Sequence, residues 1–260
     1  MKYTCLRTLY LLCLLSLVML MHTGCGGGPG QSQQPEIFTY RIEGTLIKDL
    51  NTDFAHAVAT ITRDDTTLAT AELRLDGDSL AHHQDSIYYR YVLPAGDYAA
   101  GTHELVIRDS SWFLDTLLIS LPGNFAIDSV LPTTRQKRTV DHVSLNWSGS
   151  AGTDRYVIAA VKMDSIYAGL GFTQYVTSLT TSETFPDSAF ALPGGDPDTG
   201  WFYVYVYSYT GTPDSALSAT LLPSPMPSQL DDNISGQNIA GRLGAIVVAA
   251  FDSIRVVTEP

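Results

Sequence analysis

The chain has 260 residues, a formal net charge of −12 at neutral pH, and 45% hydrophobic residues. An acidic chain repels phosphate backbones, so we expect no nucleic acid among its partners. Thr, Ser, Val and Tyr are abundant, and the sequence lacks long amphipathic stretches rich in Lys or Glu, which favours strands over helices.

The first residues have the order of an export signal. Lys2 and Arg7 precede a run from Leu9 to Met21 in which only Ser16 interrupts apolar residues. A transmembrane helix needs about 20 apolar residues, so this run is too short for a permanent span. Residues 1–24 are therefore predicted to be a signal peptide.

Thr23, Gly24 and Cys25 follow this run directly. They resemble the lipobox of bacterial lipoproteins, in which the cysteine thiol is lipidated and the cysteine becomes the new N-terminus. His22 departs from the pattern, because the family usually has leucine there. The alternative is an ordinary signal peptide cut near Gly24, which would leave Cys25 as a lone thiol in a secreted chain, whereas lipidation consumes that thiol.

The resemblance implies attachment to a membrane through a lipid on Cys25 and a location in the cell envelope. Removing residues 1–24 takes away Lys2 and Arg7 and no acidic residue, which changes the net charge from −12 to −14. Residues 25–35 are rich in Gly, Gln and Ser and are predicted to be a flexible tether. Because Gly26 is not Asp, the sorting habits of Gram-negative lipoproteins imply the outer membrane, with the leaflet left open.

The remainder of the chain is long enough for two domains of about 100 residues each. Short strands with turn signals between them predict an immunoglobulin-like β-sandwich over residues 36–126. A hairpin turn is expected at Asp76-Gly77-Asp78. The predicted strands are 38–48, 55–62, 67–75, 86–93, 102–108 and 113–121.

A second domain is predicted over residues 127–260, after a break at Pro122-Gly123-Asn124. Trp147 lies in an alternating segment, a strand follows at 156–162, and residues 201–209 alternate Tyr with Val. This pattern resembles a fibronectin type III domain, in which a buried Trp packs beneath a Tyr/Val strand. A Pro-rich insertion at 211–242 departs from that family, and strands return at 245–251 and 254–257. The fold class is thus predicted as all-β, with two tandem antiparallel sandwiches.

The strand at 201–209 carries the candidate ligand-binding site. Period-two geometry places Phe202, Val204 and Val206 on one face, which we assign to the core with Trp147. The opposite face would expose aromatic rings suited to a glycan or a protein partner, because exposed apolar faces mark interaction sites. The alternative is that the Pro-rich insertion or the first domain covers this face. The candidate residues are Trp201, Tyr203, Tyr205, Tyr207 and Tyr209.

The sequence predicts neither a metal site nor a cofactor. The acidic turns 76–78 and 196–200 each offer two carboxylates, whereas Ca²⁺ takes about 6–8 oxygen ligands, so both are expected to be ordinary turns. We expect His82, His83 and Asp85 to lie in a solvated loop rather than to bind a transition metal.

No catalytic residue is assigned, because the sequence shows no nucleophile elbow, paired carboxylates or Cys/His pair. His56, His103 and His142 are expected to satisfy local contacts. We therefore predict a non-enzymatic lipoprotein that acts as a protein-binding or structural module of the cell envelope. Carbohydrate binding through the aromatic face, and an enzyme, are the alternatives.

Overall fold

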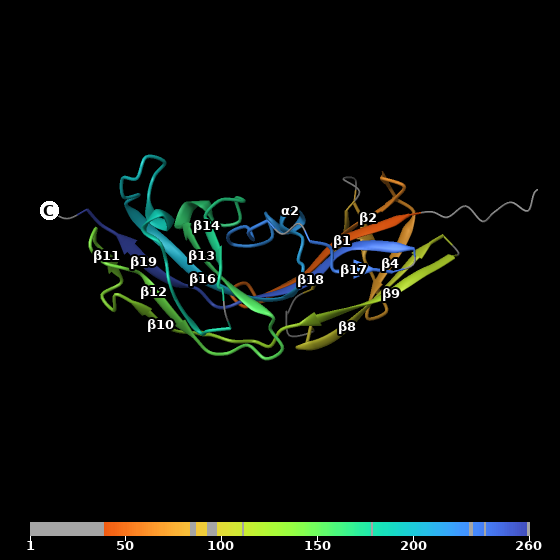
Figure 1. Ribbon diagram of the computed structural model, residues 1–260, viewed down its shortest axis with the longest axis horizontal. Coiled ribbons are helices and arrows are strands. Elements are labelled where there is room, and N and C mark those ends of the chain that lie inside the picture. The colour runs from red at the N-terminus through yellow and green to blue at the C-terminus, as the bar shows by residue number, and fades with distance from the viewer. Residues whose placement is uncertain are drawn as a thin grey trace, which may run out of the picture. The chain divides into compact units, whose positions relative to one another are not determined.

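The computed structural model describes residues 39–83, 87–92, 98–110, 112–177, 179–228, 231–236 and 238–258. These residues belong to one compact unit, Phe38–Pro260. Its regular structure is almost entirely β-strand, as predicted (Figure 1). The predicted signal peptide and tether, with Cys25, lie outside the described residues.

The first sandwich is built from the N-terminal strands. Its two layers enclose a core in which apolar side chains alternate with outward-facing ones. One layer contains β1 (Tyr40–Asp49), β2 (Phe54–Arg63), β3 (Thr66–Thr67), β6 (Ala81–His82) and β7 (Tyr88–Val92). The other layer has the strand order β5-β4-β8-β9. Its strands are β4 (Ala71–Leu75), β5 (Asp78–Ser79), β8 (Gly101–Asp109) and β9 (Trp112–Leu121).

The second sandwich has a three-stranded layer of order β10-β12-β15 packed on a larger sheet. The small layer contains β10 (Ile127–Leu131), β12 (Ser144–Trp147) and β15 (Ser182–Thr184). The larger sheet contributes β11 (Gln136–Lys137), β13 (Arg155–Lys162), β14 (Phe172–Tyr175), β16 (Gly200–Gly211) and β19 (Asp252–Val256). The connections carry the short helices η2 (Met163–Ser165), η3 (Asp187–Phe190) and α2 (Ser215–Ser218), and the two-residue strand β17 (Ile234–Ser235).

One strand, β18 (Ile239–Val248), joins the two sandwiches (Figure 1). It pairs antiparallel with the end of β16 and parallel with β1 along the whole of β1. A twelve-stranded sheet therefore runs through both sandwiches. The predicted division at residues 126 and 127 is not a boundary of this sheet, and β18 begins at Ile239, inside the predicted insertion 211–242.

The parallel pairing of β1 and β18 requires a glycine at position 241. Gly241 has a φ of +137°, and a Cβ added there would lie 1.8 Å from the carbonyl oxygen of Ile42. A side chain is thus excluded both by the backbone conformation and by the closeness of β1. The chain approaches the neighbouring strand here more closely than any other residue type would allow.

The inner faces of the sheets form one continuous apolar core. Trp147 is buried and meets the ring of Tyr156 edge to face, with 5.4 Å between centroids. Phe202, Val204 and Val206 of β16 are buried in the same core, as the alternation predicted. The predicted hairpin at residues 76–78 forms between β4 and β5, whereas the predicted strand 67–75 is divided into β3 and β4. In the described part of the chain, no helix is long and apolar enough to cross a membrane.

Candidate functional site

The aromatic row of β16 lies on the outer face of the twelve-stranded sheet. β13 and β18 flank β16, and their outward side chains extend the row into an apolar surface. Val157, Ala159 and Val161, which alternate along β13, lie on this face. Ile47 of β1 belongs to the same cluster, so residues of both sandwiches contribute to it.

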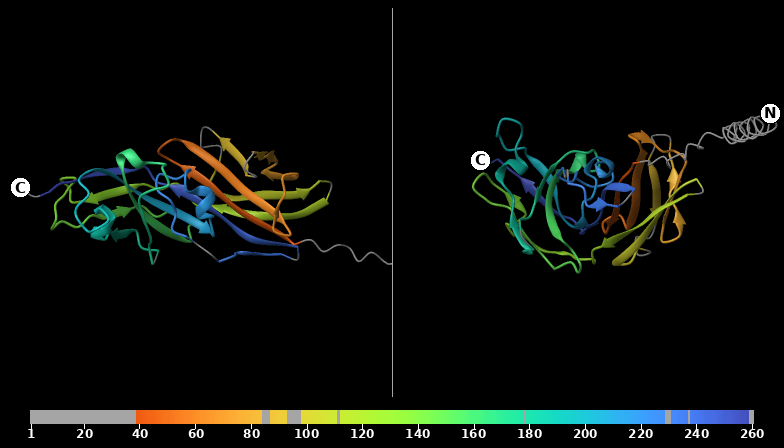
Figure 2. Two further views of the ribbon diagram at one scale, coloured as in Figure 1. Left: turned by 90° about the horizontal axis from the view of Figure 1, so that it is seen from above. Right: turned by 45° about the vertical axis from the view of Figure 1, so that its right-hand side comes forward.

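The Pro-rich segment after β16 covers the centre of this face. We call residues 212–228 the cover segment; it includes α2 and lies over the sheet (Figures 1 and 2). Leu222 and Met226 are buried against the aromatic row. The predicted alternative, that the insertion packs on the aromatic face, is therefore what the structure shows.

Hydrogen bonds from tyrosine hydroxyls fix the cover segment in place. The Tyr207 hydroxyl donates to the carbonyl oxygen of Ser224 at 2.9 Å and accepts from the amide nitrogen of Ser224 at 3.0 Å. The Tyr175 hydroxyl donates to the carbonyl oxygen of Pro227 at 2.8 Å. Since these backbone groups belong to no strand or helix, the tyrosines supply partners that secondary structure would otherwise provide.

The start of the cover segment is held by the buried carboxylate of Asp214. This carboxylate accepts from the amide of Leu217, capping α2, and forms a 2.8 Å ion pair with Arg242 of β18. The amide of Asp214 donates to the hydroxyl oxygen of Thr45 on β1 at 2.7 Å. One residue therefore attaches the cover segment both to β18 and to β1, with which β18 pairs.

The five candidate residues do not form one open platform. Tyr205, Tyr207 and Tyr209 are buried, whereas Tyr203 is half-buried and Trp201 remains 43% exposed. Burial raises the pKa of Tyr207 well above that of an exposed tyrosine, and burial together with the nearby Asp49 raises the pKa of Tyr205. In this structure, a ligand could therefore stack only on the uncovered end of the row.

A polar cluster that the sequence did not predict lies near Tyr205 of the row. The buried Asp49 carboxylate accepts hydrogen bonds from the Tyr167 hydroxyl and from the backbone and side chain of Asn51. The Phe251 ring lies 4.2 Å from that of Tyr203, between ring centroids. These residues come from three different connections between strands, so their meeting could not be predicted from the sequence. Only Asp49 and Asn51, which are close together at the β1–β2 turn, form a pattern that is visible locally.

Several residues of the acidic turns, and the histidines at 56 and 103, use their polar atoms within the protein, whereas His82 and His83 are exposed and His82 belongs to β6. Asp76 accepts from the amide of Glu104 and contacts the ring of His103 at 2.6 Å, and Asp78 pairs with Arg90. Asp198 pairs with Lys162, and the ring of His56 contacts the Tyr89 hydroxyl. Asp85 lies outside the described residues, and those that are described contain no cluster of three or more potential metal ligands.

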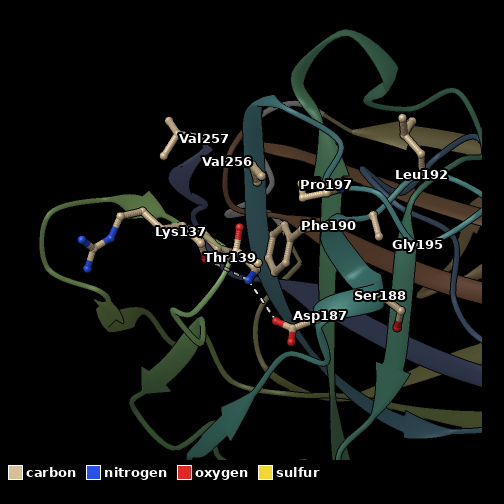
Figure 3. A pocket seen from close by; sticks show the side chains of 12 residues that line it. Lys137, Thr139, Asp187, Ser188, Phe190, Leu192, Gly195, Pro197, Val256 and Val257 are labelled. Atoms are coloured by element: carbon tan, nitrogen blue, oxygen red, sulfur yellow. Dashed lines mark hydrogen bonds and ion pairs between the residues drawn. The ribbon is translucent and has the colours of Figure 1, made fainter. Parts of the chain in front are cut away.

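A cleft of about 430 Å³ lies near the start of β16, where Val256 pairs with Gly200, between η3, the following loop and the C-terminal strand (Figure 3). Phe190, Pro197 and Val256 give it an apolar lining. The Lys137 ammonium group at its side donates to Asp187 at 2.9 Å and to the carbonyl oxygen of Asp141 at 2.8 Å. This lysine is therefore engaged in holding β11 to η3.

Comparisons with known proteins give structural likeness alone. No protein-family model matches the chain, and no curated protein matches it. A structure described as "DIP-gamma IG1+IG2" matches with a TM-score of 0.23 and 9% identity over 80% of this chain and 97% of that one. The Yersinia pseudotuberculosis adhesin InvE matches with a TM-score of 0.22 and 12% identity over 66% of this chain and 55% of that one. Three N-terminal domains of the bacteriophage RB49 outer capsid protein Hoc match with a TM-score of 0.25 and 12% identity, over 85% of this chain and 59% of that one.

Proposed function

We propose that this protein is a membrane-anchored extracytoplasmic lipoprotein whose folded body acts as a protein-binding or structural module of the cell envelope. The observation that carries the proposal is the use of the aromatic face for internal packing. The cover segment and the sheet together bury Tyr205, Tyr207 and Tyr209, so these rings stabilise one body made of both sandwiches. The proposal includes no catalytic residue.

The membrane anchor in this proposal rests on the sequence. The basic start, the short apolar run and the small residues before Cys25 together support export and lipidation at that cysteine. An outer-membrane destination is proposed because Gly26 follows Cys25. Residues 26–35 would then act as the tether between the lipid and β1.

Metabolic labelling with an alkyne-bearing fatty acid tests the anchor. The full chain, expressed in a Gram-negative bacterium, should incorporate the label and remain in the membrane fraction, with the outer membrane as the expected site. Cys25→Ala should lose the label, whereas Ser32→Ala in the tether should keep it. Equal labelling of the Cys25→Ala variant would contradict the anchor.

Crosslinking in intact cells tests the module. With a partner in the envelope, a short amine- or carboxyl-reactive crosslinker should give a discrete heavier band that contains this chain and co-purifies from native membranes. A chain that migrates alone under mild crosslinking and purifies alone would contradict a protein-binding role.

Carbohydrate binding remains a second candidate because Trp201 is exposed and Tyr203 is half-buried. Aromatic rings with a polar rim suit sugar stacking. A glycan-array signal lost in Trp201→Ala and retained in Tyr91→Ala, an exposed aromatic residue on β7, would favour this candidate. A signal unaffected by Trp201→Ala would count against it.

A further inference from the structure

β9 is a long apolar strand at the edge of a sheet. It pairs with β8 and ends the order β5-β4-β8-β9, so no described strand pairs with its other side. Over its ten residues Asp115 is the single charged side chain. Trp112 is 76% exposed and Leu118 is 71% exposed. Natural sheet edges usually carry charges, prolines or a covering segment, so an apolar edge of this length invites pairing with another strand.

Two hydrogen bonds show which backbone groups of β9 face away from β8. The amide of Thr116 donates to the side chain of Asp115 at 2.8 Å, and the carbonyl oxygen of Ser120 accepts from the hydroxyl of Thr210. Backbone groups in an antiparallel strand alternate between the two sides, and the register with β8 is continuous from residue 115 to 121. The N–H and C=O of Leu118 therefore also point away from β8, between the Asp115–Thr116 contact on one side and the contact of Ser120 with Thr210 of β16 on the other.

A groove of about 320 Å³ lies along this side of β9. One wall is β9 itself, from Asp115 to Leu118, and the other is formed by Asn233 to Gly236 around β17 together with Leu243 of β18. The lining includes the Asp115 carboxylate and contains neither Lys nor Arg. A ligand with an extended backbone and a basic side chain would complement both the strand edge and this charge.

We propose that β9 accepts an extended strand of a partner polypeptide, which adds to the sheet edge through the outward N–H and C=O of Leu118. The partner strand carries apolar side chains that contact Leu118 and Trp112, and a Lys or Arg that reaches Asp115. A second copy of this chain is a poorer occupant, because it would bring another Asp115 into the groove and a further net charge of −12, or −14 after removal of residues 1–24. The inference rests on the proposed role in protein binding and names the surface that performs it.

A displayed library of ten-residue peptides with Val, Ile, Leu or Thr at alternate positions is the probe. It is selected on the purified full chain in detergent, and the strongest peptide is synthesised for affinity measurement and amide hydrogen exchange. The selected peptides should be enriched in Lys or Arg at one register position. In the free chain the Leu118 amide should exchange faster than that of Ile119, and the peptide should slow the exchange of Leu118.

Two variants with a matched control test the register. Leu118→Pro removes the outward amide and should weaken peptide binding at least tenfold, since proline is tolerated on edge strands where the amide faces away from the ladder. Ser182→Pro is the control, because β15 is also an edge strand. The amide of Thr184 faces away from β12 and donates to the side chain of Glu183, so the amide of Ser182, two residues earlier, faces away from β12 as well. Should Leu118→Pro unfold, Asp115→Lys retains the backbone and should still weaken binding of a basic peptide at least tenfold.

The outcomes separate this inference from the proposed function. A library that yields no binder, or a binder insensitive to Leu118→Pro and Asp115→Lys, overturns the β9 site. If the crosslinked envelope partner persists in Leu118→Pro, the protein-binding role stands and the surface lies elsewhere. A dimer of the full chain that dissociates in Leu118→Pro makes the occupant a second copy, which also overturns the partner strand.

Discussion

The outer face of β16 and the outer edge of β9 both carry large apolar side chains, but their surroundings differ. The tyrosines of β16 lie beneath the cover segment, and their hydroxyls bond to its backbone. Trp112 and Leu118 of β9 are mostly exposed, and Leu118 lines a groove. The strand with the most aromatic residues is therefore part of the core, whereas β9, which is shorter and has fewer aromatic residues, carries the accessible apolar surface.

The largest expected effect is at the pairing of β1 with β18, the strand that joins the two sandwiches. Gly241→Val should destabilise the body by more than about 4 kcal/mol, because a side chain there collides with the carbonyl oxygen of Ile42 and separates β1 from β18. Gly77→Val is the control, since Gly77 has a φ of +88° with no atom within 4 Å of an added Cβ. Chemical denaturation of the two variants measures the difference. Equal losses would mean that backbone strain alone accounts for the cost.

Removal of the Asp214 carboxylate should be the next largest change. Asp214→Ala leaves the α2 amide and the partly buried Arg242 without this partner, and breaking a buried ion pair typically costs about 3–5 kcal/mol. The cover segment should also loosen, with faster amide exchange over residues 214–226 than in the wild type. Asp232→Ala removes a carboxylate from an exposed pair with Arg41 and should shift the denaturation midpoint much less. A comparable shift of the denaturation midpoint in both variants would contradict the role of Asp214 in holding the cover segment.

The hydroxyl of Tyr207 offers a smaller and more selective change. Tyr207→Phe keeps the ring but deprives the amide and carbonyl of Ser224 of their partner, which should cost about 1–3 kcal/mol. Trp201→Phe, at the exposed end of the same strand, should remain within about 0.5 kcal/mol of the wild type. Urea denaturation of both variants tests this gradient along β16. A neutral Tyr207→Phe would mean that the cover segment is held by apolar contacts alone.

Alkaline pH should weaken the covered region while leaving stability near neutral pH unchanged. Burial raises the pKa of Tyr205 and Tyr207 in the folded protein above the ordinary value of about 10. A raised folded pKa contributes stability that is present below the unfolded pKa and is lost as the pH rises through the folded pKa. The urea midpoint should therefore fall from about pH 10 upward, and the fall should be shallower in Tyr207→Phe. A midpoint that stays constant to about pH 11 would contradict the burial of these phenols.

The alternation of the sequence was enough to predict the inner and outer faces of β16 and β13. Phe202, Val204 and Val206 lie in the core beside Trp147, because residues two apart share a face whatever the partner strand. The hairpin at Asp76 was predictable for a similar reason, since a turn needs only local residues. These signals act over a few positions of the chain.

Long-range pairing could not be predicted in the same way. β1 and β18 pair in parallel between residues about 200 positions apart, and neither strand carries a local mark of its partner. The glycine at position 241 becomes meaningful only when Ile42 is known to lie next to it. Likewise, the sequence allowed either an open aromatic face or one covered by the Pro-rich insertion. The contacts of Leu222 and Met226 with the tyrosines show that the face is covered.

Tyrosine-selective labelling of the purified full chain, with peptide-level readout, tests the covered aromatic face most directly. Tyr91 of β7, which is 45% exposed, serves as the internal reference for an accessible ring. We predict that Tyr91 is labelled readily while Tyr207 and Tyr209 stay unmodified until denaturant is added. Labelling of Tyr207 in the native chain at the rate of Tyr91 would show that the face is open. The aromatic row would then be the main candidate for the binding site.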